Sequence, residues 1–372
     1  MKLTFKRVLK WSALALPVIL FAWFQFAYWT STNDCGKKTG APAHPMRAIR
    51  YCEYGPADHV LKLEQVEKPV PNDNQILVRV RAVSLRFFDG GMLGGSIPGR
   101  LLFGLRKPKN TTPGTDFAGT VEAVGRSVTE FKPGDEVFGV KSGCLAEYIC
   151  VRADRGAVVL KPANVTFEQA ASIPTALVAL QGLRDTAQMK PGQKILINGA
   201  SGGIGTFTVQ IAKAYGAEVT GVCSMRNLDL VRSIGADHVI DYTKEDYTKG
   251  DERYDVIYDL VNNHSFAERR RVLKPGGICV IAGVGGSGMH EETFSRFVGV
   301  FTASLRSKFG NEKFVIFGVD INKADLGVLR DMTESGKILP ALTKTYPLTE
   351  AAAAYTYLET GHVQGKIAIT VE

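Results

Sequence analysis

A glycine-rich heptapeptide in the middle of the chain limits the possible folds more than any other feature. Residues 199–205 read GASGGIG, an apolar run at 194–198 precedes them, and a helical pattern follows. Glycines between a buried strand and a helix permit a tight turn, and they let backbone amides approach a pyrophosphate at the helix N-terminus. The segment lacks the Lys-Ser/Thr ending of a phosphate-transfer loop, which excludes ATP chemistry. It therefore predicts a dinucleotide site, with contacts from Ser201, Gly202, Gly203, Ile204 and Gly205.

The hydrophobic pattern divides the chain into two kinds of domain. Between about residues 170 and 312, short apolar strands alternate with helical segments, which is typical of a parallel, doubly wound sheet. Over residues 46–160 the strands instead alternate apolar and polar residues, as in ILVRVRAV at 76–83, which favours an antiparallel or barrel-like domain. We expect an α/β protein with one domain over 46–170 and 313–372 and a cofactor domain over 171–312.

The end of the second strand of the cofactor domain predicts which dinucleotide binds. An NAD site places Asp or Glu there for the ribose hydroxyls. This chain has Cys223, Ser224, Met225, Arg226 and Asn227, without an acid. Ser224 can donate to a phosphate and Arg226 can pair with it through two N–H groups. The residues predict NADP(H), although Arg226 could instead be a solvated surface residue.

Several short motifs outside the glycine turn carry a family resemblance. They are PGTDFAG at 113–119, KPGDEVFG at 132–139, AASIP at 170–174, LKPGG at 273–277 and GK at 365–366. With them, residues 46–372 resemble the medium-chain dehydrogenase/reductase superfamily, in its zinc-independent quinone oxidoreductase-like (zeta-crystallin-like) branch. The resemblance implies a GroES-like catalytic domain around a Rossmann domain, with the nicotinamide in the cleft between them. We also expect cofactor contacts from four later residues: Tyr242, Gly283, Val284 and Lys366.

The same resemblance bears on metal binding and catalysis. Zinc-using relatives carry Gly-His-Glu where this chain has Gly114, Thr115 and Asp116, and a Cys ligand in the loop that here contains Arg86. Zn²⁺ needs Cys or His ligands of this kind, so no metal is expected. Arg86 is the candidate catalytic residue, because a cation beside the cleft could stabilise oxyanion charge during hydride addition. The alternative is that Arg86 pairs with a structural carboxylate such as Asp89.

The N-terminal segment predicts a membrane anchor. Residues 11–30 contain three polar residues and no charge, and twenty helical residues span about 30 Å, one hydrocarbon thickness. Aromatic residues lie at both ends of the stretch, as at membrane interfaces. We expect a basic N-terminus over 1–10, an uncleaved single-pass helix over 11–30 and a linker over 31–45. The alternative is a signal peptide, but the stretch is long and no small-residue cleavage site follows it.

Charge and cysteine content bear on partners and compartment. The net charge is +8, and residues 1–50 hold eight Lys or Arg against one Asp, so nearly all of the excess is N-terminal. A basic segment beside an apolar one suits an anionic membrane surface better than a nucleic acid. The six cysteines are scattered without CxxC spacing, which predicts reduced thiols. Because the cofactor requires a compartment that contains NADPH, we expect residues 46–372 to face the cytosol or another reducing compartment. The four cations over residues 2–10 instead favour a cytoplasmic N-terminus, which would send these residues outside.

A glycine-rich, apolar segment at residues 90–109 interrupts the β-rich domain. It could pack on its own domain, cover the substrate site or make a second membrane contact. Together the features predict an NADPH-dependent oxidoreductase that transfers hydride to a quinone, enone or other activated carbonyl compound, with a lipophilic substrate. The alternative is a catalytically weak, membrane-tethered NADPH-binding sensor or scaffold. A homodimer is expected only by analogy with the family.

Overall fold

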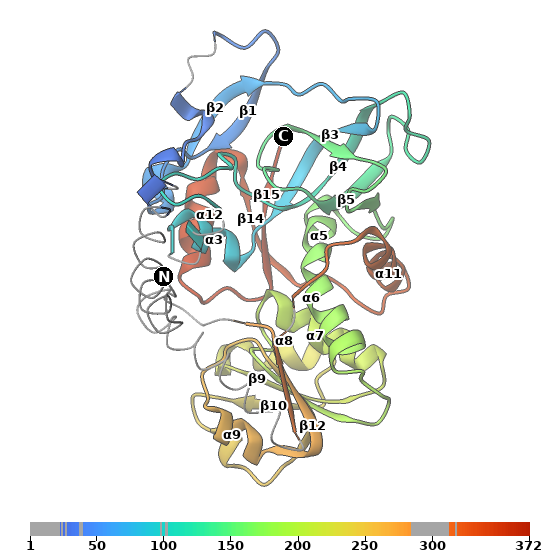
Figure 1. Cartoon of the computed structure of the whole chain (residues 1–372). Helices are drawn as coiled ribbons and strands as arrows, with labels where there is room; N and C mark the ends of the chain where they lie inside the picture. Colours follow the sequence, from blue (N-terminus) through green and yellow to red (C-terminus); the bar gives the residue numbers. More distant parts are fainter. Residues whose placement is uncertain are drawn as a thin grey trace, which may run out of the picture.

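The computed structural model describes most of the chain outside the N-terminus and one stretch of the cofactor domain. The described residues are 23, 25–26, 28–36, 40–96, 99–100, 103–283, 312–316 and 318–372. Two larger sheets organise them, one in the upper and one in the lower half of Figure 1, with α5 (Phe167–Ser172) and α6 (Ala176–Gln181) between the halves. The α/β class predicted from the sequence is confirmed.

The lower half is the predicted parallel sheet. Its strand order is β10-β9-β8-β11-β12-β13, and every neighbouring pair is parallel. The strands are β8 (Lys194–Asn198), β9 (Glu218–Cys223), β10 (His238–Asp241), β11 (Tyr254–Asp259), β12 (Leu273–Ile281) and β13 (Lys313–Ile316). The intervening elements are α7 (Gly203–Ala214), η4 (Met225–Asn227), α8 (Leu228–Ser233), η5 (Tyr247–Lys249) and α9 (Phe266–Arg271). The reversal between β8 and β11 is the switch point at which such sheets bind ligands.

The upper half is mostly antiparallel. One sheet has the order β14-β15-β3-β4-β5-β7 with β6 paired to β3, and β1 pairs with β2 in a separate ribbon. The strands are β1 (Pro45–Arg50), β2 (Lys62–Glu67), β3 (Gln75–Ser84), β4 (Asp116–Val124), β5 (Glu136–Val140), β6 (Tyr148–Arg152), β7 (Val158–Leu160), β14 (Leu342–Pro347) and β15 (Lys366–Thr370). Short helices flank them: α2 (Ala57–Val60), α3 (Phe87–Leu93), α11 (Lys323–Glu334), η7 (Leu348–Glu350) and α12 (Ala351–Glu359). The strand predicted at 76–83 is β3.

Residues 167–186 form several short helical pieces in succession. After α5, η2 (Ile173–Thr175) leads into α6, and a π-helical turn, η3 (Gly182–Thr186), ends the segment. Pro174 lies in η2 and has no N–H to donate, so a continuous ladder of helical hydrogen bonds cannot form there. The break lets this segment pass from one sheet to the other.

The prediction that all six thiols are reduced is wrong for two of them. Cys35 and Cys52 form a disulfide, with 5.7 Å between their Cα atoms. Cys35 lies in η1 (Asp34–Gly36) and Cys52 follows β1, and the fold brings these two segments together. The other four cysteines are free, and Cys144, Cys223 and Cys279 are buried.

Most of the predicted anchor over 11–30 lies outside the described residues. The end of the stretch, Tyr28–Thr30, is helical. Within the part of the chain that the structure describes, no helix is both long and apolar enough to cross a membrane.

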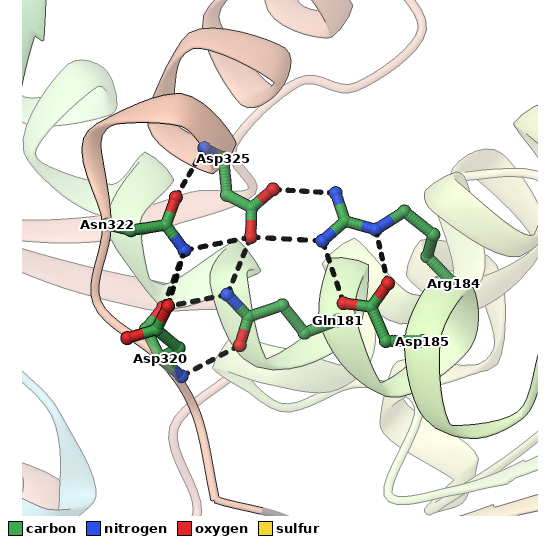
Figure 2. Close-up of polar contacts among 6 residues, drawn as sticks. All are labelled: Gln181, Arg184, Asp185, Asp320, Asn322 and Asp325. Atoms are coloured by element: carbon green, nitrogen blue, oxygen red, sulfur yellow. Dashed lines mark hydrogen bonds and ion pairs between the residues drawn. The ribbon is translucent and has the colours of Figure 1, made fainter.

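The return of the chain from the parallel sheet to α11 is held by a dense polar network (Figure 2). The Gln181 side-chain amide accepts from the Asp320 backbone N–H at 2.9 Å and donates to the Asp320 carbonyl at 2.7 Å. The Arg184 guanidinium pairs with Asp325 at 2.6 Å, and Asn322 caps α11 by accepting from the Asp325 N–H at 2.8 Å. The chain passes from the antiparallel sheet to the parallel sheet through α5 to η3, which contain Gln181 and Arg184, and it returns between β13 and α11 through residues 320–325. The network therefore joins the two segments that connect the sheets.

Replacing Asp325 should give a pH-dependent loss of stability. Hydrogen bonding from Arg184 is the largest cause that lowers the pKa of Asp325 to about 2. Its stabilising effect is therefore complete above the unfolded pKa of about 3.9 and disappears as pH falls toward 2. We expect Asp325→Asn to lower the free energy of unfolding at pH 7 by about 1–2 kcal/mol, since Arg184 is partly exposed.

Urea unfolding from pH 7 to pH 2 measures this effect. The difference between the wild type and the variant should shrink between pH 4 and pH 2. Asp331→Asn, on the same helix but in an exposed pair with Arg330, is the control and should stay within about 0.5 kcal/mol of the wild type. A difference that stays constant over the whole pH range would contradict the assignment to the Asp325 carboxylate.

Candidate active site

The glycine-rich turn joins β8 to α7 at the switch point of the parallel sheet. Gly199 has a φ of +92°, and Gly202 is the N-cap of α7. A Cβ at Gly205 would lie 2.1 Å from the Gly199 carbonyl oxygen, so no side chain fits there. The first N–H groups of a helix have no partner within the helix, and here they lie beside a backbone without side chains. The predicted residues Ser201 to Gly205 thus form a cradle that fits a pyrophosphate.

The C-terminal strand closes one side of this cradle. The Gly365 N–H donates to the Ser201 carbonyl at 2.8 Å, and Gly202 and Gly365 form an isolated bridge. The next residue, Lys366, is fully buried, and its ammonium donates to the Leu85 carbonyl at 2.6 Å. Burial lowers the pKa of Lys366 to about 8. The Lys366 side chain thus lies against Gly203 of the cradle, with its ammonium bound to the end of β3.

Ser224 and Arg226 lie at the end of β9, as the sequence predicts. Arg226 is exposed in η4, where its guanidinium donates to the His362 carbonyl at 3.1 Å. Tyr242 follows β10 with 58% of its surface exposed, and its N–H donates to the Cys223 carbonyl at the end of β9. No acid lies between Cys223 and Asn227, but Asp241 ends β10 directly beside Cys223.

Asn227 connects the parts of the site, and sequence reasoning gave it no role. Its buried side-chain amide donates to the Ser201 hydroxyl at 2.9 Å and to the Ser224 hydroxyl at 3.2 Å. Its oxygen accepts from the Gln364 side-chain amide. One side chain therefore links the glycine turn, the end of β9 and the segment before β15. The only sequence signal is a polar residue beside Arg226.

The remaining predicted contacts lie after the other strands. Gly283 follows β12, and a Cβ there would lie 1.9 Å from the Leu260 carbonyl oxygen, so the two loops need a glycine. Val284 lies outside the described residues. Asp259 is the last residue of β11 and is fully buried. Its carboxylate pairs with Arg269 at 2.7 Å and accepts a hydrogen bond from the Asn198 side-chain amide at 2.9 Å. This buried pair holds the ends of β8 and β11 together.

Arg86 belongs to an ion pair with a buried carboxylate. Its Nε donates to Asp116 at 2.6 Å, and its Nη2 makes a second contact with the same carboxylate. The Thr175 hydroxyl also donates to Asp116, at 3.1 Å. Arg86 therefore does pair with a buried carboxylate, as the alternative interpretation predicted, but this carboxylate is Asp116 and not Asp89. Asp89 instead accepts from the Arg86 backbone N–H at 3.1 Å at the start of α3.

The ion pair leaves part of Arg86 available. Its side chain is 22% exposed, and within the described chain its Nη1 has no hydrogen-bond partner. Burial opposes the charge, but Asp116 outweighs this and the pKa of Arg86 is raised, so the guanidinium stays protonated. Burial also raises the pKa of Asp89 to about 6, against the attraction of Arg86. Arg86 is thus a permanent hydrogen-bond donor, oriented by Asp116.

The same positions do not fit zinc. Where zinc-using relatives would place ligands, this chain has a guanidinium at Arg86 and a hydroxyl at Thr115, neither of which is a typical zinc ligand. Among the residues with described positions, no group of three or more His, Cys, Asp or Glu is placed to hold a metal ion.

Two family models match the chain. The model described as alcohol dehydrogenase GroES-like domain covers residues 72–163, and the one described as zinc-binding dehydrogenase covers residues 234–369. The chain is 34% identical to an Arabidopsis thaliana protein named NADPH-dependent alkenal/one oxidoreductase, chloroplastic, over 87% of this chain and 79% of that protein.

Two further matches agree with these. A second Arabidopsis thaliana protein, named chloroplast envelope quinone oxidoreductase homolog, is 31% identical over 87% of this chain and 98% of its own length. The solved quinone oxidoreductase from Coxiella burnetii superposes with a TM-score of 0.75 at 29% identity, covering 88% of this chain and all of that one. By its sequence, its two sheets and its glycine-rich turn, the chain belongs to the medium-chain dehydrogenase/reductase superfamily, with quinone oxidoreductase-like relatives.

Proposed function

We propose that the chain is an NADPH-dependent oxidoreductase that transfers hydride to a quinone or an α,β-unsaturated carbonyl compound. The observation that carries the proposal is the glycine cradle at the switch point, with the exposed Arg226 at the end of β9 and no acid in residues 223–227. The names of the two Arabidopsis relatives support the same cofactor and acceptor classes.

The chain's own residues would divide the binding of NADPH between them. The amides at the start of α7 would bind the pyrophosphate, and Arg226 with Ser224 would bind the 2′-phosphate. Gly283, Tyr242 and Lys366 would line the cofactor. Bound NADPH supplies a hydride, that is, two electrons and one hydrogen nucleus, to the acceptor.

Arg86 would stabilise the charge that this transfer creates. Hydride addition to the carbon–carbon bond of an enone moves negative charge onto the carbonyl oxygen. An Nη1 donor whose guanidinium is held by Asp116 is oriented before the reaction, which is how such donors act most strongly. Water could supply the proton that completes the reduction.

We further propose that the apolar stretch at 11–30 anchors the chain in a membrane, with a lipophilic substrate dissolved in the same bilayer. The uncharged length of the stretch supports this, and the relative named as a chloroplast envelope protein is consistent with a membrane setting. We also propose that residues 46–170 and 313–372 form the catalytic domain and that residues 171–312 form the cofactor domain. The proposed assembly is a homodimer.

The enzymatic proposal is tested by an NADPH-oxidation assay with quinones, enones and saturated aldehydes. We expect turnover of quinones and enones and little turnover of saturated aldehydes, because an isolated carbonyl group accepts hydride less readily than these activated acceptors. Binding of NADPH without turnover of any acceptor would favour the sensor or scaffold alternative instead.

Arg226→Ala should weaken NADPH and leave NADH nearly unchanged, because NADH has no 2′-phosphate. A charge-assisted hydrogen bond contributes about 1.5–3 kcal/mol, so the dissociation constant of NADPH should rise roughly 10- to 100-fold. Fluorescence titration with both nucleotides measures this. Arg232→Ala, an exposed arginine paired with Asp229 on α8, is the control. Equal losses for both nucleotides would remove Arg226 from the site.

A paired substitution separates a catalytic Arg86 from a structural one. Arg86→Met with Asp116→Asn removes both charges and leaves no buried carboxylate unpaired. If Nη1 stabilises the oxyanion, kcat for an enone should fall about 100- to 1,000-fold while the dissociation constant of NADPH stays the same. Asp116→Asn alone keeps the cation and should retain most of kcat. A doubly substituted enzyme as active as the wild type would show that Arg86 is only the counter-ion of Asp116.

A further inference from the structure

The residues expected to form the free start of a linker are instead attached to the catalytic domain. Asp34 pairs with Arg50 at 3.0 Å and accepts from the Thr111 hydroxyl at 2.9 Å. The Asn33 side-chain amide donates to the Cys52 carbonyl at 2.9 Å, and Cys35 is bonded to Cys52. Three successive residues therefore hold the end of the apolar segment against the end of β1.

A second set of contacts joins the same segment to the loop after α3. The Ser31 hydroxyl accepts from the Arg106 N–H at 3.2 Å, and the Arg106 guanidinium lies over the Trp29 ring, 5.1 Å from its centroid. The loop is itself attached to the domain, because the Tyr54 hydroxyl donates to the Gly104 carbonyl at 2.6 Å. The loop belongs to the segment at 90–109, for which the sequence left three roles open.

The surface formed by these two segments combines aromatic and basic side chains. Trp23, Phe26 and Trp29 are between 62% and 69% exposed. Arg106, Lys107 and Lys109 are exposed on the loop, where Arg106 contacts Trp29, and residues 96–111 contain no acid. Aromatic rings favour the headgroup region of a bilayer, and clustered cations favour anionic lipids.

The position of this surface relative to the candidate active site is fixed by α3. Arg86 is the N-cap of α3, and the loop that carries Arg106, Lys107 and Lys109 follows the C-terminal end of this helix. Figure 1 shows α3 on the same side of the molecule as the blue N-terminal residues. A surface that rests on a bilayer through Trp29 and Lys107 would therefore turn the α3 side of the site toward the lipid.

We propose that residues 23, 25–26, 28–36 and 103–110 form one membrane-facing surface that holds the catalytic domain in a fixed orientation on an anionic bilayer. The proposal rests on the anchor proposed above. Continuity with the uncharged stretch at 11–22 and the cations of the loop identify the occupant as lipid with anionic headgroups. An acceptor dissolved in the bilayer would then reach the site without crossing water.

Hydrogen–deuterium exchange of the full-length protein tests the surface. The protein is reconstituted in vesicles of phosphatidylcholine alone or mixed with phosphatidylserine. We expect residues 103–110 to exchange more slowly in the mixed vesicles, and high salt should reduce this protection. Identical exchange in both vesicles, or failure of the protein to stay on vesicles, would overturn the proposal.

Charge reversal separates the surface from the anchor and from the chemistry. Lys107→Glu with Lys109→Glu should leave the protein on the vesicles but abolish the extra protection. It should also raise KM for a bilayer-dissolved quinone by about fivefold per cation, with a water-soluble enone unaffected. Lys132→Glu with Lys337→Glu, two exposed lysines elsewhere, is the matched control. An equal change for both acceptors would contradict the proposal, while loss of turnover in the wild type would contradict only the proposed activity.

Removal of the disulfide tests whether the orientation is fixed. In Cys35→Ser with Cys52→Ser the anchor remains, so vesicle binding should persist while protection of 103–110 falls toward its level in phosphatidylcholine vesicles. Turnover of the water-soluble enone reports that the fold is intact. Unchanged protection would show that the attachment of residues 33–35 does not orient the domain.

Discussion

The close contact between the start of β15 and the glycine-rich turn is the constraint on which the cleft depends. Gly365 has a φ of +54°, and a Cβ there would lie 2.1 Å from the Ala341 carbonyl oxygen. Only glycine allows the strand to approach closely enough for its N–H to reach Ser201. Because β15 belongs to the catalytic sheet and Ser201 to the cofactor domain, this contact sets how far apart the two sides of the site lie.

Charge inside the cleft is balanced by pairing over short distances. Arg86 and Asp116 form one pair, and Lys366 and Asp89 lie close enough to influence it and each other. A buried charge without a partner destabilises the fold, so replacing any one of these four groups with a neutral residue would leave an unbalanced charge among the other three. The pair also holds the guanidinium in place before a substrate arrives, which links the stability of the site to its proposed chemistry.

The N-terminal segment extends the same principle to the outside of the molecule. Hydrogen bonds, an ion pair and a disulfide attach residues 31–35 to the catalytic domain near the loop after α3. Disulfides are rare in reducing compartments, where those present are commonly redox-active. Reducing surroundings would therefore break the Cys35–Cys52 disulfide and remove one of the bonds that attach the segment to the catalytic domain.

The sequence by itself determined the two kinds of sheet, the glycine cradle, the preference for a phosphorylated dinucleotide and the family, because periodicity and short motifs express local preferences. It did not determine the partners of the charged side chains. The pairing of Ser84 with Asp116 in β3 and β4 brings Arg86 to Asp116, and the pairing of Ser84 with Ala368 brings Lys366 near Leu85. Sheet register and packing likewise joined Cys35 to Cys52 and Asn227 to Gln364. Such contacts span distances along the chain over which local patterns carry no information, so only the tertiary structure decided them.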